Sequence, residues 1–251
     1  MEAHPQAGNV NGMNLNLEEC SAADNHLWLI EEFVTVLAAY QPKSVLDVGC
    51  GAGMLLKTCK ARGMNVSGVD QPGPRLAELK ADGFYVQEGS AYELPMEPGS
   101  VDWITLRHVP HHLKDPARAF RELLRVARCG VLLAEPTYDA RVPSQQCSGR
   151  ADSWEKRQHR RGGMYHAESY DLAGLLDLMP EGYETEFSIE VRETLRLRSA
   201  SLEDFRRRAD SLTAELPSDD PECTAKEALL AEAGETGLSW NGSLLLTLVR
   251  R

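Results

Sequence analysis

Short apolar runs alternate with amphipathic segments between residues 25 and 136. A short apolar run that ends in a turn is typical of a buried strand. The runs predicted to be strands are 44–48, 66–70, 84–87, 101–106 and 131–134. Helical spacing of apolar residues predicts helices at 25–40, 54–61 and 116–126, the last with Asp115 as its cap and Pro116 at its first position. This alternation is typical of an α/β protein.

The pattern changes after residue 136. Residues 137–167 are polar and too numerous for an ordinary connection, so we expect a lid or substrate loop there. A helix is expected at 169–179, a long strand region at 184–197 and a final strand at 244–249.

Two further helices are expected before the last strand. Residues 202–212 and 223–233 have helical spacing and are separated by a proline-rich turn, within an insertion at 198–236. The insertion would cover the substrate pocket or form an oligomer contact. We therefore expect a single domain over 19–251, whose cofactor-binding half is 43–136, after a disordered tail at 1–18.

The first predicted strand ends in a turn with three glycines on alternate positions, in the sequence Asp47-Val48-Gly49-Cys50-Gly51-Ala52-Gly53. Glycine lets a backbone approach a bulky ligand where a Cβ atom would clash. A dinucleotide loop has the spacing G-x-G-x-x-G, but Met54 occupies the place of its third glycine, which disfavours an NAD-dependent dehydrogenase. Asp70 ends the second strand, where a carboxylate can accept hydrogen bonds from both ribose hydroxyls. Together these features indicate a ligand that contains a nucleoside.

The order and spacing of these motifs resemble class I S-adenosylmethionine-dependent methyltransferases of the small-molecule type. The resemblance covers about residues 43–136, and residues 119–126 match the helix before the family's fifth strand. It implies a Rossmann-like, doubly wound, seven-stranded and mostly parallel sheet whose last strand is antiparallel. It also implies a transferase that uses S-adenosylmethionine and releases S-adenosylhomocysteine.

The same resemblance gives roles to residues near the strand ends. Asp47 would organise the turn or bind the ammonium group of the cofactor, and Asp70 would bind its ribose. Arg107 would lie near the sulfonium centre or the cofactor carboxylate. The glycine-loop residues expected to pass beneath the amino-acid moiety of the cofactor are Gly49, Cys50, Gly51 and Gly53. The residues expected around the adenine are Gln71, Ser90, Ala91 and Tyr92. Among them, Ser90 stands where such proteins often carry an acid.

Three histidines, His108, His111 and His112, follow the fourth predicted strand, near the expected methyl group. An imidazole there could deprotonate a hydroxyl or amine acceptor, and the resemblance favours His112 for this role. A metal site made of these three is disfavoured, since no acidic or thiol partner lies in the same segment. Secondary candidates for the same pocket are Glu135, Tyr138, Tyr165 and His166.

The amino-acid composition disfavours some classes of methyl acceptor. Acidic residues outnumber basic ones by 38 to 27, and a net charge of −11 repels phosphate backbones, so nucleic acid is disfavoured. The 6 cysteines form no CxxC pair and are expected to be reduced thiols. With no apparent signal peptide or membrane span, a cytoplasmic protein is expected.

A methyltransferase for a small metabolite is therefore the leading hypothesis. One alternative is a methyltransferase that acts on tRNA or protein, because the cofactor half of such folds does not specify the acceptor. Another is a non-catalytic subunit that uses the helical insertion to bind a partner protein. The acceptor atom and the oligomeric state stay open at this stage.

Overall fold

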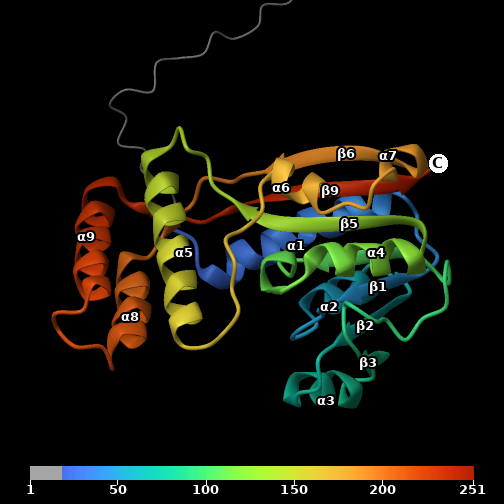
Figure 1. Cartoon of the computed structure of the whole chain (residues 1–251), viewed down its shortest axis with the longest axis horizontal. Coiled ribbons are helices and arrows are strands. Elements are labelled where there is room, and N and C mark those ends of the chain that lie inside the picture. Colours follow the sequence, from blue (N-terminus) through green and yellow to red (C-terminus); the bar gives the residue numbers. More distant parts are fainter. Residues whose placement is uncertain (1–18) are drawn as a thin grey trace, which may run out of the picture.

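The computed structural model describes residues 19–251, so the predicted disordered tail at 1–18 lies outside the described residues. Its main sheet has seven strands in the order β3-β2-β1-β4-β5-β9-β6 (Figure 1). Their bounds are β1 Val45–Val48, β2 Val66–Asp70, β3 Val86–Glu88, β4 Val101–Arg107, β5 Ala127–Thr137, β6 Phe187–Thr194 and β9 Gly242–Arg250. A second, two-stranded sheet pairs β7 (Ser199–Ala200) with β8 (Leu238–Ser239).

The direction of the strands confirms the predicted fold. The first five strands are parallel to one another, whereas β9 is antiparallel to both of its neighbours, β5 and β6. The carboxyl ends of β1, β2, β4 and β5 consequently lie along one edge of the sheet. Ligands of open α/β sheets bind outside such an edge, where the strand order reverses from one side of β1 to the other.

Helices cover both faces of the sheet because successive strand residues point to opposite sides. Leu46 and Leu133 belong to the apolar core beneath α4 (Pro116–Val126) and α6 (Leu172–Asp177). Val45 and Leu132 belong to the core beneath α1 (Ala22–Ala39) and α2 (Met54–Ala61). Helix α3 (Pro74–Ala81) covers the β3 end of the sheet.

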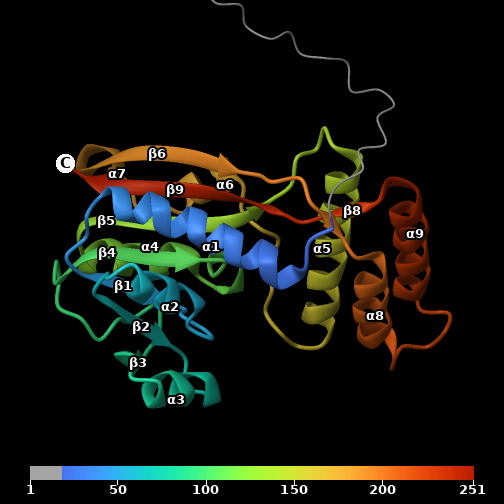
Figure 2. The same cartoon turned by 180° about the vertical axis from the view of Figure 1, so that it is seen from behind.

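Three helices form a separate layer beside the sheet (Figures 1 and 2). They are α5 (Pro143–Arg161), α8 (Leu202–Thr213) and α9 (Pro221–Thr236), and their shared core contains Trp154, Phe205 and Leu230. The predicted helices at 202–212 and 223–233 are thus present as α8 and α9. We call these three helices the helical layer.

The expectation of a loop at 137–167 is wrong for most of that segment, because α5 occupies 19 of its residues. The helix is polar around most of its circumference, which conceals its helical pattern. Only a narrow stripe, with Cys147, Ala151 and Trp154 spaced by three or four residues, is apolar and buried. This stripe packs into the helical layer, so the segment is a structural helix.

Other boundaries also differ from the predicted ones. Strand β5 was expected to end before Glu135 but continues to Thr137, with Pro136 aligned with Ser243 of β9. The pairing with β4 ends at Ala134, so Pro136 lies where the strand has a neighbour on one side only, which tolerates a missing N–H. The helix expected at 169–179 is the shorter α6, and the one-turn helix α7 (Tyr183–Glu186) precedes β6.

The beginning of the described chain is joined to its end. The indole Nε1 of Trp240 donates a hydrogen bond of 2.8 Å to the carbonyl oxygen of Cys20, just before α1. Asn25 of α1 is buried and its amide donates to the carbonyl of Asn241 at 3.5 Å. Helix α1 is therefore anchored beside the link between β8 and β9 (Figure 2). In the described residues no helix is both long enough and apolar enough to cross a membrane.

Candidate functional site

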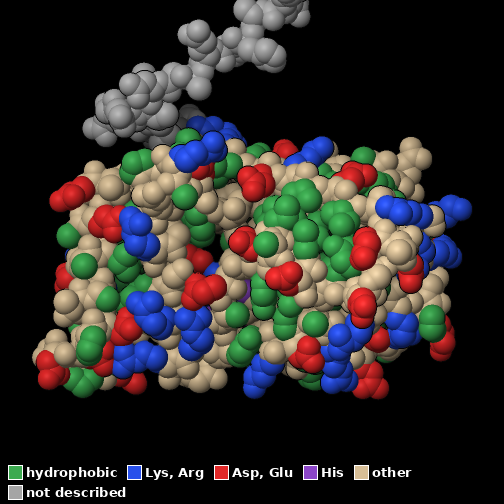
Figure 3. Space-filling view, turned by 45° about the horizontal axis from the view of Figure 1, so that its top comes forward, with side chains coloured by type: hydrophobic (Ala, Val, Ile, Leu, Met, Phe, Trp, Pro, Cys, Tyr) green, Lys and Arg blue, Asp and Glu red, His purple; other side chains and the backbone are tan. Residues whose placement is uncertain are grey.

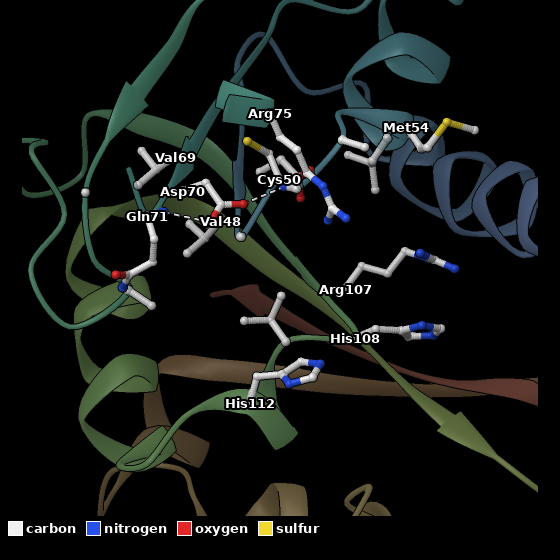
Figure 4. Close-up of a pocket in the computed structure, with 18 of the residues that line it drawn as sticks. Val48, Cys50, Met54, Val69, Asp70, Gln71, Arg75, Arg107, His108 and His112 are labelled. Atoms are coloured by element: carbon white, nitrogen blue, oxygen red, sulfur yellow. Dashed lines mark hydrogen bonds between the residues drawn. The ribbon is translucent and has the colours of Figure 1, made fainter. Parts of the chain in front are cut away.

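A cavity of about 660 Å³ opens at the carboxyl ends of β1, β2 and β4 (Figure 4). The residues predicted to contact a cofactor that line it are Asp47, Gly49, Cys50, Gly51, Asp70, Gln71, Ser90, Ala91, Tyr92 and Arg107. Gly53 is the predicted residue that does not. His108 and His112 also line the cavity, and His111 does not.

The glycine loop takes backbone conformations that side chains resist. Gly49, Gly51 and Gly53 all have positive φ, at 75°, 54° and 70°. A Cβ on Gly49 would lie 2.6 Å from Cγ2 of Val109, whereas one on Gly51 would meet nothing closer than 4.0 Å and would enter the open cavity. A Cβ on Gly53 would instead collide with Leu79 of α3, which gives this glycine a packing role away from the cavity.

Asp70 connects the second strand to the glycine loop. Its Oδ2 accepts the backbone N–H of Gly51 at 2.5 Å, and its Oδ1 accepts the backbone N–H of Gln71 at 2.6 Å. Figure 4 shows both bonds as dashed lines. Each carboxylate oxygen has a second lone pair, so the group can still accept hydrogen bonds from two vicinal hydroxyls.

Ser90 and Tyr92 form a fixed wall of the cavity. The Tyr92 backbone N–H donates to Oγ of Ser90 at 3.2 Å. The Tyr92 hydroxyl accepts the N–H of Lys114 at 2.8 Å and that of Asp115 at 3.2 Å, and the Arg118 guanidinium lies 5.4 Å from the ring centroid. Tyr92 is therefore held at its far end, and it borders the cavity without being free to act as a lid.

Asp47 lies at the floor of the cavity with only 4% of its surface exposed. Thr105 Oγ1 donates a hydrogen bond to its Oδ1 at 2.8 Å. Burial raises the pKa of Asp47 to about 7, although the Thr105 hydrogen bond and the nearby Arg107 charge oppose this shift. A cationic group bound beside Asp47 would favour its ionised form.

Arg107 ends β4 and lines the same cavity. Burial lowers the pKa of its guanidinium to about 10, and its Nε has no hydrogen-bond partner among the described residues. Its Nη2 lies 3.5 Å from Nδ1 of His26. A buried guanidinium N–H without an acceptor is costly, so an anionic ligand group is a suitable partner.

His108 has an unusual backbone. Its φ is 55°, a left-handed value that a residue with a Cβ adopts rarely, while its N–H donates to the carbonyl of Ala134 at 2.8 Å. Burial holds the pKa of His108 well below its ordinary value, and its Nε2 is without a partner in residues 19–251. Strained backbone of this kind is concentrated at functional sites.

His111 does not line the cavity and is hydrogen-bonded to a buried carboxylate. Its Nδ1 lies 2.9 and 2.8 Å from the two carboxylate oxygens of Glu135, which is fully buried. Glu135 also accepts the backbone N–H of Tyr170 at 3.2 Å. Of the secondary candidates, Glu135 thus positions His111, and Tyr138 faces α5, where it packs against Gly149.

His112 borders the cavity and also contacts His166 from the segment after α5. The ring centroids of His112 and His166 are 4.3 Å apart. Burial, reinforced by nearby positive groups, lowers the pKa of His112 to about 4 and that of His166 to about 3. Both imidazoles are therefore neutral at pH 7. His159 of α5 completes the group, with its Nδ1 2.9 Å from Nδ1 of His166.

Some lining residues were not predicted. His26 and Ile30 reach the cavity from α1, and Arg75 reaches it from α3. The helical spacing at 25–40 indicated a helix that packs on the sheet or closes the cleft, but nothing in the local sequence marked His26. The pairing of His111 with Glu135 also escaped prediction, since 24 residues separate them.

The strand order, the antiparallel β9, the glycine loop after β1 and the acid at the tip of β2 define a class I, S-adenosylmethionine-dependent methyltransferase domain. Residues 46–134 match a family model described as a methyltransferase domain. Residues 46–134 thus match a methyltransferase domain, and the fold around them is that of class I methyltransferases.

Related sequences agree with this assignment. An uncharacterized methyltransferase from Mycobacterium sp. (strain JLS) is 39% identical over 94 residues, which are 36% of this chain and 36% of the relative. A ubiquinone biosynthesis O-methyltransferase from Pseudomonas aeruginosa (strain UCBPP-PA14) is 34% identical over 95 residues, 35% of this chain and 41% of the relative. The matches span only about a third of the first relatives, 33% and 36%.

Solved structures extend the likeness of fold to most of the chain. A cyclopropane-fatty-acyl-phospholipid synthase-like protein from Lactobacillus casei has a TM-score of 0.64, with 15% identity over 92% of this chain and 95% of that chain. The YcgJ protein from Bacillus subtilis has a TM-score of 0.59, with 16% identity over 88% of this chain and 99% of that chain. At such low identity these likenesses concern the fold alone.

Proposed function

We propose that this protein transfers a methyl group from S-adenosylmethionine to a small-molecule acceptor. The observation that carries the proposal is the position of Asp70, whose carboxylate receives the Gly51 N–H of the glycine loop and faces the cavity at the sheet edge. The cavity, at about 660 Å³, is within the range of about 300–1,000 Å³ that is typical of small-molecule sites.

The chemistry of the cavity wall fits this cofactor. Asp70 would accept the ribose hydroxyls, and the backbone at Gly51, open above its missing Cβ, would pass beneath the amino-acid moiety. The unpartnered Nε–H of Arg107 would donate to the cofactor carboxylate, and Asp47 would face its ammonium group. The adenine would lie toward Gln71, Ser90, Ala91 and Tyr92, which line the same cavity. Figure 4 shows Gln71 on the opposite side of the cavity from Arg107 and His108.

Bound S-adenosylmethionine would supply an electrophilic methyl group on a sulfonium centre. For an in-line displacement, the residues of the chain chiefly need to orient the acceptor and exclude water. His112 is exposed at the cavity wall, and His108 is half-buried in it, so these histidines are the side chains of the predicted trio that can face an acceptor. The lowered pKa of His112 makes its imidazole a weak general base on its own.

Three observations support a small acceptor. On the face shown in Figure 3, acidic and basic side chains are interspersed, without a continuous basic surface among the residues the model describes. The net charge of −11 also opposes binding to a phosphate backbone. Relatives named ubiquinone biosynthesis O-methyltransferases match 35% of this chain, in keeping with a hydroxyl acceptor.

Calorimetric titration tests the donor first. We expect S-adenosylmethionine and S-adenosylhomocysteine to bind with micromolar affinity, NAD not to bind, and Asp70→Ala to lose the binding. Glu88→Ala is the matched control, because Glu88 occupies the tip of the adjacent strand β3 but does not line the cavity. A folded, ligand-free sample that binds neither cofactor form would contradict the proposal.

A second experiment tests the acceptor. Incubation with labelled methyl donor and a metabolite extract should label small molecules. Label that enters only tRNA or protein would reject a small-molecule acceptor while leaving methyl transfer intact. No label with any acceptor, despite confirmed cofactor binding, would favour the non-catalytic subunit.

A further inference from the structure

Four histidines meet beside the cavity, with His112 as the member that lines it, and methyl transfer does not account for the group. We call His111, His112, His159 and His166 the histidine cluster. Its ring centroids are 4.4 Å apart for His111 and His112, 4.3 Å for His112 and His166, and 5.1 Å for His159 and His166. In Figure 3 a histidine side chain is visible in the hollow between the helical layer and the sheet.

Three members of the cluster hold ring nitrogens close to one another. One ring nitrogen from each of His111, His112 and His166 lies within 4.8 Å of the other two. Three imidazoles bound to a tetrahedral Zn²⁺ at about 2.1 Å hold their nitrogens about 3.4 Å apart. His112 is exposed, so its side chain has room to rotate toward the other two rings.

His111 is oriented in the way that metal-bound histidines usually are. Glu135 holds its Nδ1 with both carboxylate oxygens, at 2.9 and 2.8 Å, which leaves Nε2 as the nitrogen available to a metal. A carboxylate that accepts the other N–H of a ligating imidazole fixes the tautomer and strengthens the ligand. Glu135 is fully buried at the end of β5 and is itself held by the Tyr170 N–H, so the pair is rigid.

His166 is also fixed, although it lies in a segment without regular structure. The N–H of the next residue, Ala167, donates to the carbonyl of His111 at 2.8 Å. The carbonyl of His166 accepts a hydrogen bond from Arg160, and its Nδ1 meets Nδ1 of His159 at 2.9 Å, which leaves its Nε2 available. The nearby cation Lys156 is paired with Asp152 at 2.7 Å and does not occupy the cluster.

We propose that His111, His112 and His166 bind one divalent transition-metal ion, with Zn²⁺ as the best match. Three imidazoles suit Zn²⁺, which accepts tetrahedral sites with nitrogen ligands, whereas Mg²⁺ and Ca²⁺ require oxygen ligands. Three protein ligands leave a fourth position open, which is the arrangement of catalytic zinc sites. The negative charge of Glu135 behind His111 offsets part of the charge of the ion.

The position of the proposed ion suits it to activate the methyl acceptor. His112 belongs both to the proposed metal site and to the cavity wall, so an ion bound by it would lie next to the cavity. A Lewis acid there would lower the pKa of a hydroxyl or thiol group bound at its open position. The preferred acceptor would thus carry a hydroxyl or thiol group. This role rests on the proposed function, whereas the metal site does not.

Metal binding is tested directly on the untagged full chain, without cofactor or acceptor. Chelator-treated protein is titrated with Zn²⁺ against a chromogenic competitor, and with Co²⁺ to observe the visible absorption of a tetrahedral ion. We expect one ion per chain. His166→Ala should weaken Zn²⁺ binding at least about 100-fold, and Glu135→Gln, which keeps a hydrogen bond to His111 but removes the charge, about 10- to 100-fold.

His26→Ala is the matched control, because His26 lines the same cavity but is not part of the cluster, and it should leave Zn²⁺ affinity unchanged. Circular dichroism establishes that each variant is folded. The proposal is overturned if the native chain binds no stoichiometric Zn²⁺, or if a folded His166→Ala binds it equally well. Calorimetry with S-adenosylhomocysteine on the same samples separates this outcome from a failure of the proposed function, since loss of cofactor binding with intact Zn²⁺ binding would reject only the latter.

Discussion

The backbone N–H of Gly51 donates a 2.5 Å hydrogen bond to Oδ2 of Asp70, so the glycine loop after β1 is held by the tip of β2. The same carboxylate holds the N–H of Gln71. One side chain thereby fixes two turns that border the cavity and still offers lone pairs to a ligand. The residue predicted to bind the ribose also builds the loop that would bind the rest of the cofactor.

Replacement of Asp70 should therefore affect cofactor binding twice. Hydrogen bonds to a charged acceptor contribute about 1.5–3 kcal/mol each, so Asp70→Asn should weaken S-adenosylhomocysteine binding at least about 10-fold and Asp70→Ala more strongly. Calorimetry gives both affinities, with Glu88→Ala as the control. Equal affinities for the native chain and Asp70→Ala would show that this carboxylate does not face the ligand.

Substitution of Gly49 tests separately how backbone strain and side-chain packing contribute to the stability of the glycine loop. Gly49 and Gly63 have nearly equal φ, 75° and 72°, but a Cβ would strike Val109 only at Gly49 and would meet nothing at Gly63. Both alanine variants should lose about 1–2 kcal/mol from left-handed backbone strain. Gly49→Ala should lose more in urea unfolding, and its cofactor affinity should fall while that of Gly63→Ala does not. Equal losses of stability in the two variants would mean that the Val109 side chain moves aside at no cost in free energy.

The raised pKa of Asp47 predicts that the stability of the folded protein depends on pH. Its pKa is about 7 in the folded protein and about 3.9 in an unfolded chain, so between these values the folded state retains a proton that the unfolded state has lost. Stability should therefore fall as the pH rises from about 4 to 7 and then level off. Unfolding in urea at several pH values should show the native chain losing roughly 1–4 kcal/mol relative to Asp47→Asn across this window. A difference independent of pH would contradict the buried, protonated Asp47.

We predict that the buried ring of Trp154 stabilises the helical layer. It is 1% exposed, and its ring meets Phe205 edge-to-face with centroids 6.4 Å apart. Trp154→Ala should cost about 3–5 kcal/mol. Trp154→Phe should cost much less, because the indole Nε1 has no hydrogen-bond partner in the described part of the chain and its removal relieves a buried polar group. Thermal unfolding of the two variants checks this order, and equal losses would show that the indole N–H is satisfied.

Local patterns predicted the cofactor half because its chemistry lies next to its strands in the sequence. Asp47 and the glycines follow β1 directly, Asp70 ends β2 and Arg107 ends β4, so the parallel sheet brings them to one edge without further information. Their ligand contacts stay predictions, whereas their common cavity is a feature of the structure.

The histidine cluster could not be predicted in the same way. His111, Glu135 and His166 come from three separate segments of the chain. Glu135 reaches His111 because β5 is longer than its apolar run indicated. His166 lies beside them because the backbone N–H of Ala167 is hydrogen-bonded to the carbonyl of His111. Helix α5 was missed for a different reason. Its polar majority outweighed the stripe of Cys147, Ala151 and Trp154, which would have revealed a helix with one narrow buried face.

The bond from Trp240 to Cys20 bears on when the cavity can form during synthesis. Helix α1 supplies His26 and Ile30 to the cavity wall, and it packs against Leu245 of β9 beside the anchor at Trp240. A chain still emerging from the ribosome would have the glycine loop and Asp70 long before it has β9. The nucleoside half of the site can then be assembled early, but the wall that α1 provides is completed only after β9 has been made. A cofactor that needs that wall would bind a chain that already includes β9 and not a shorter one.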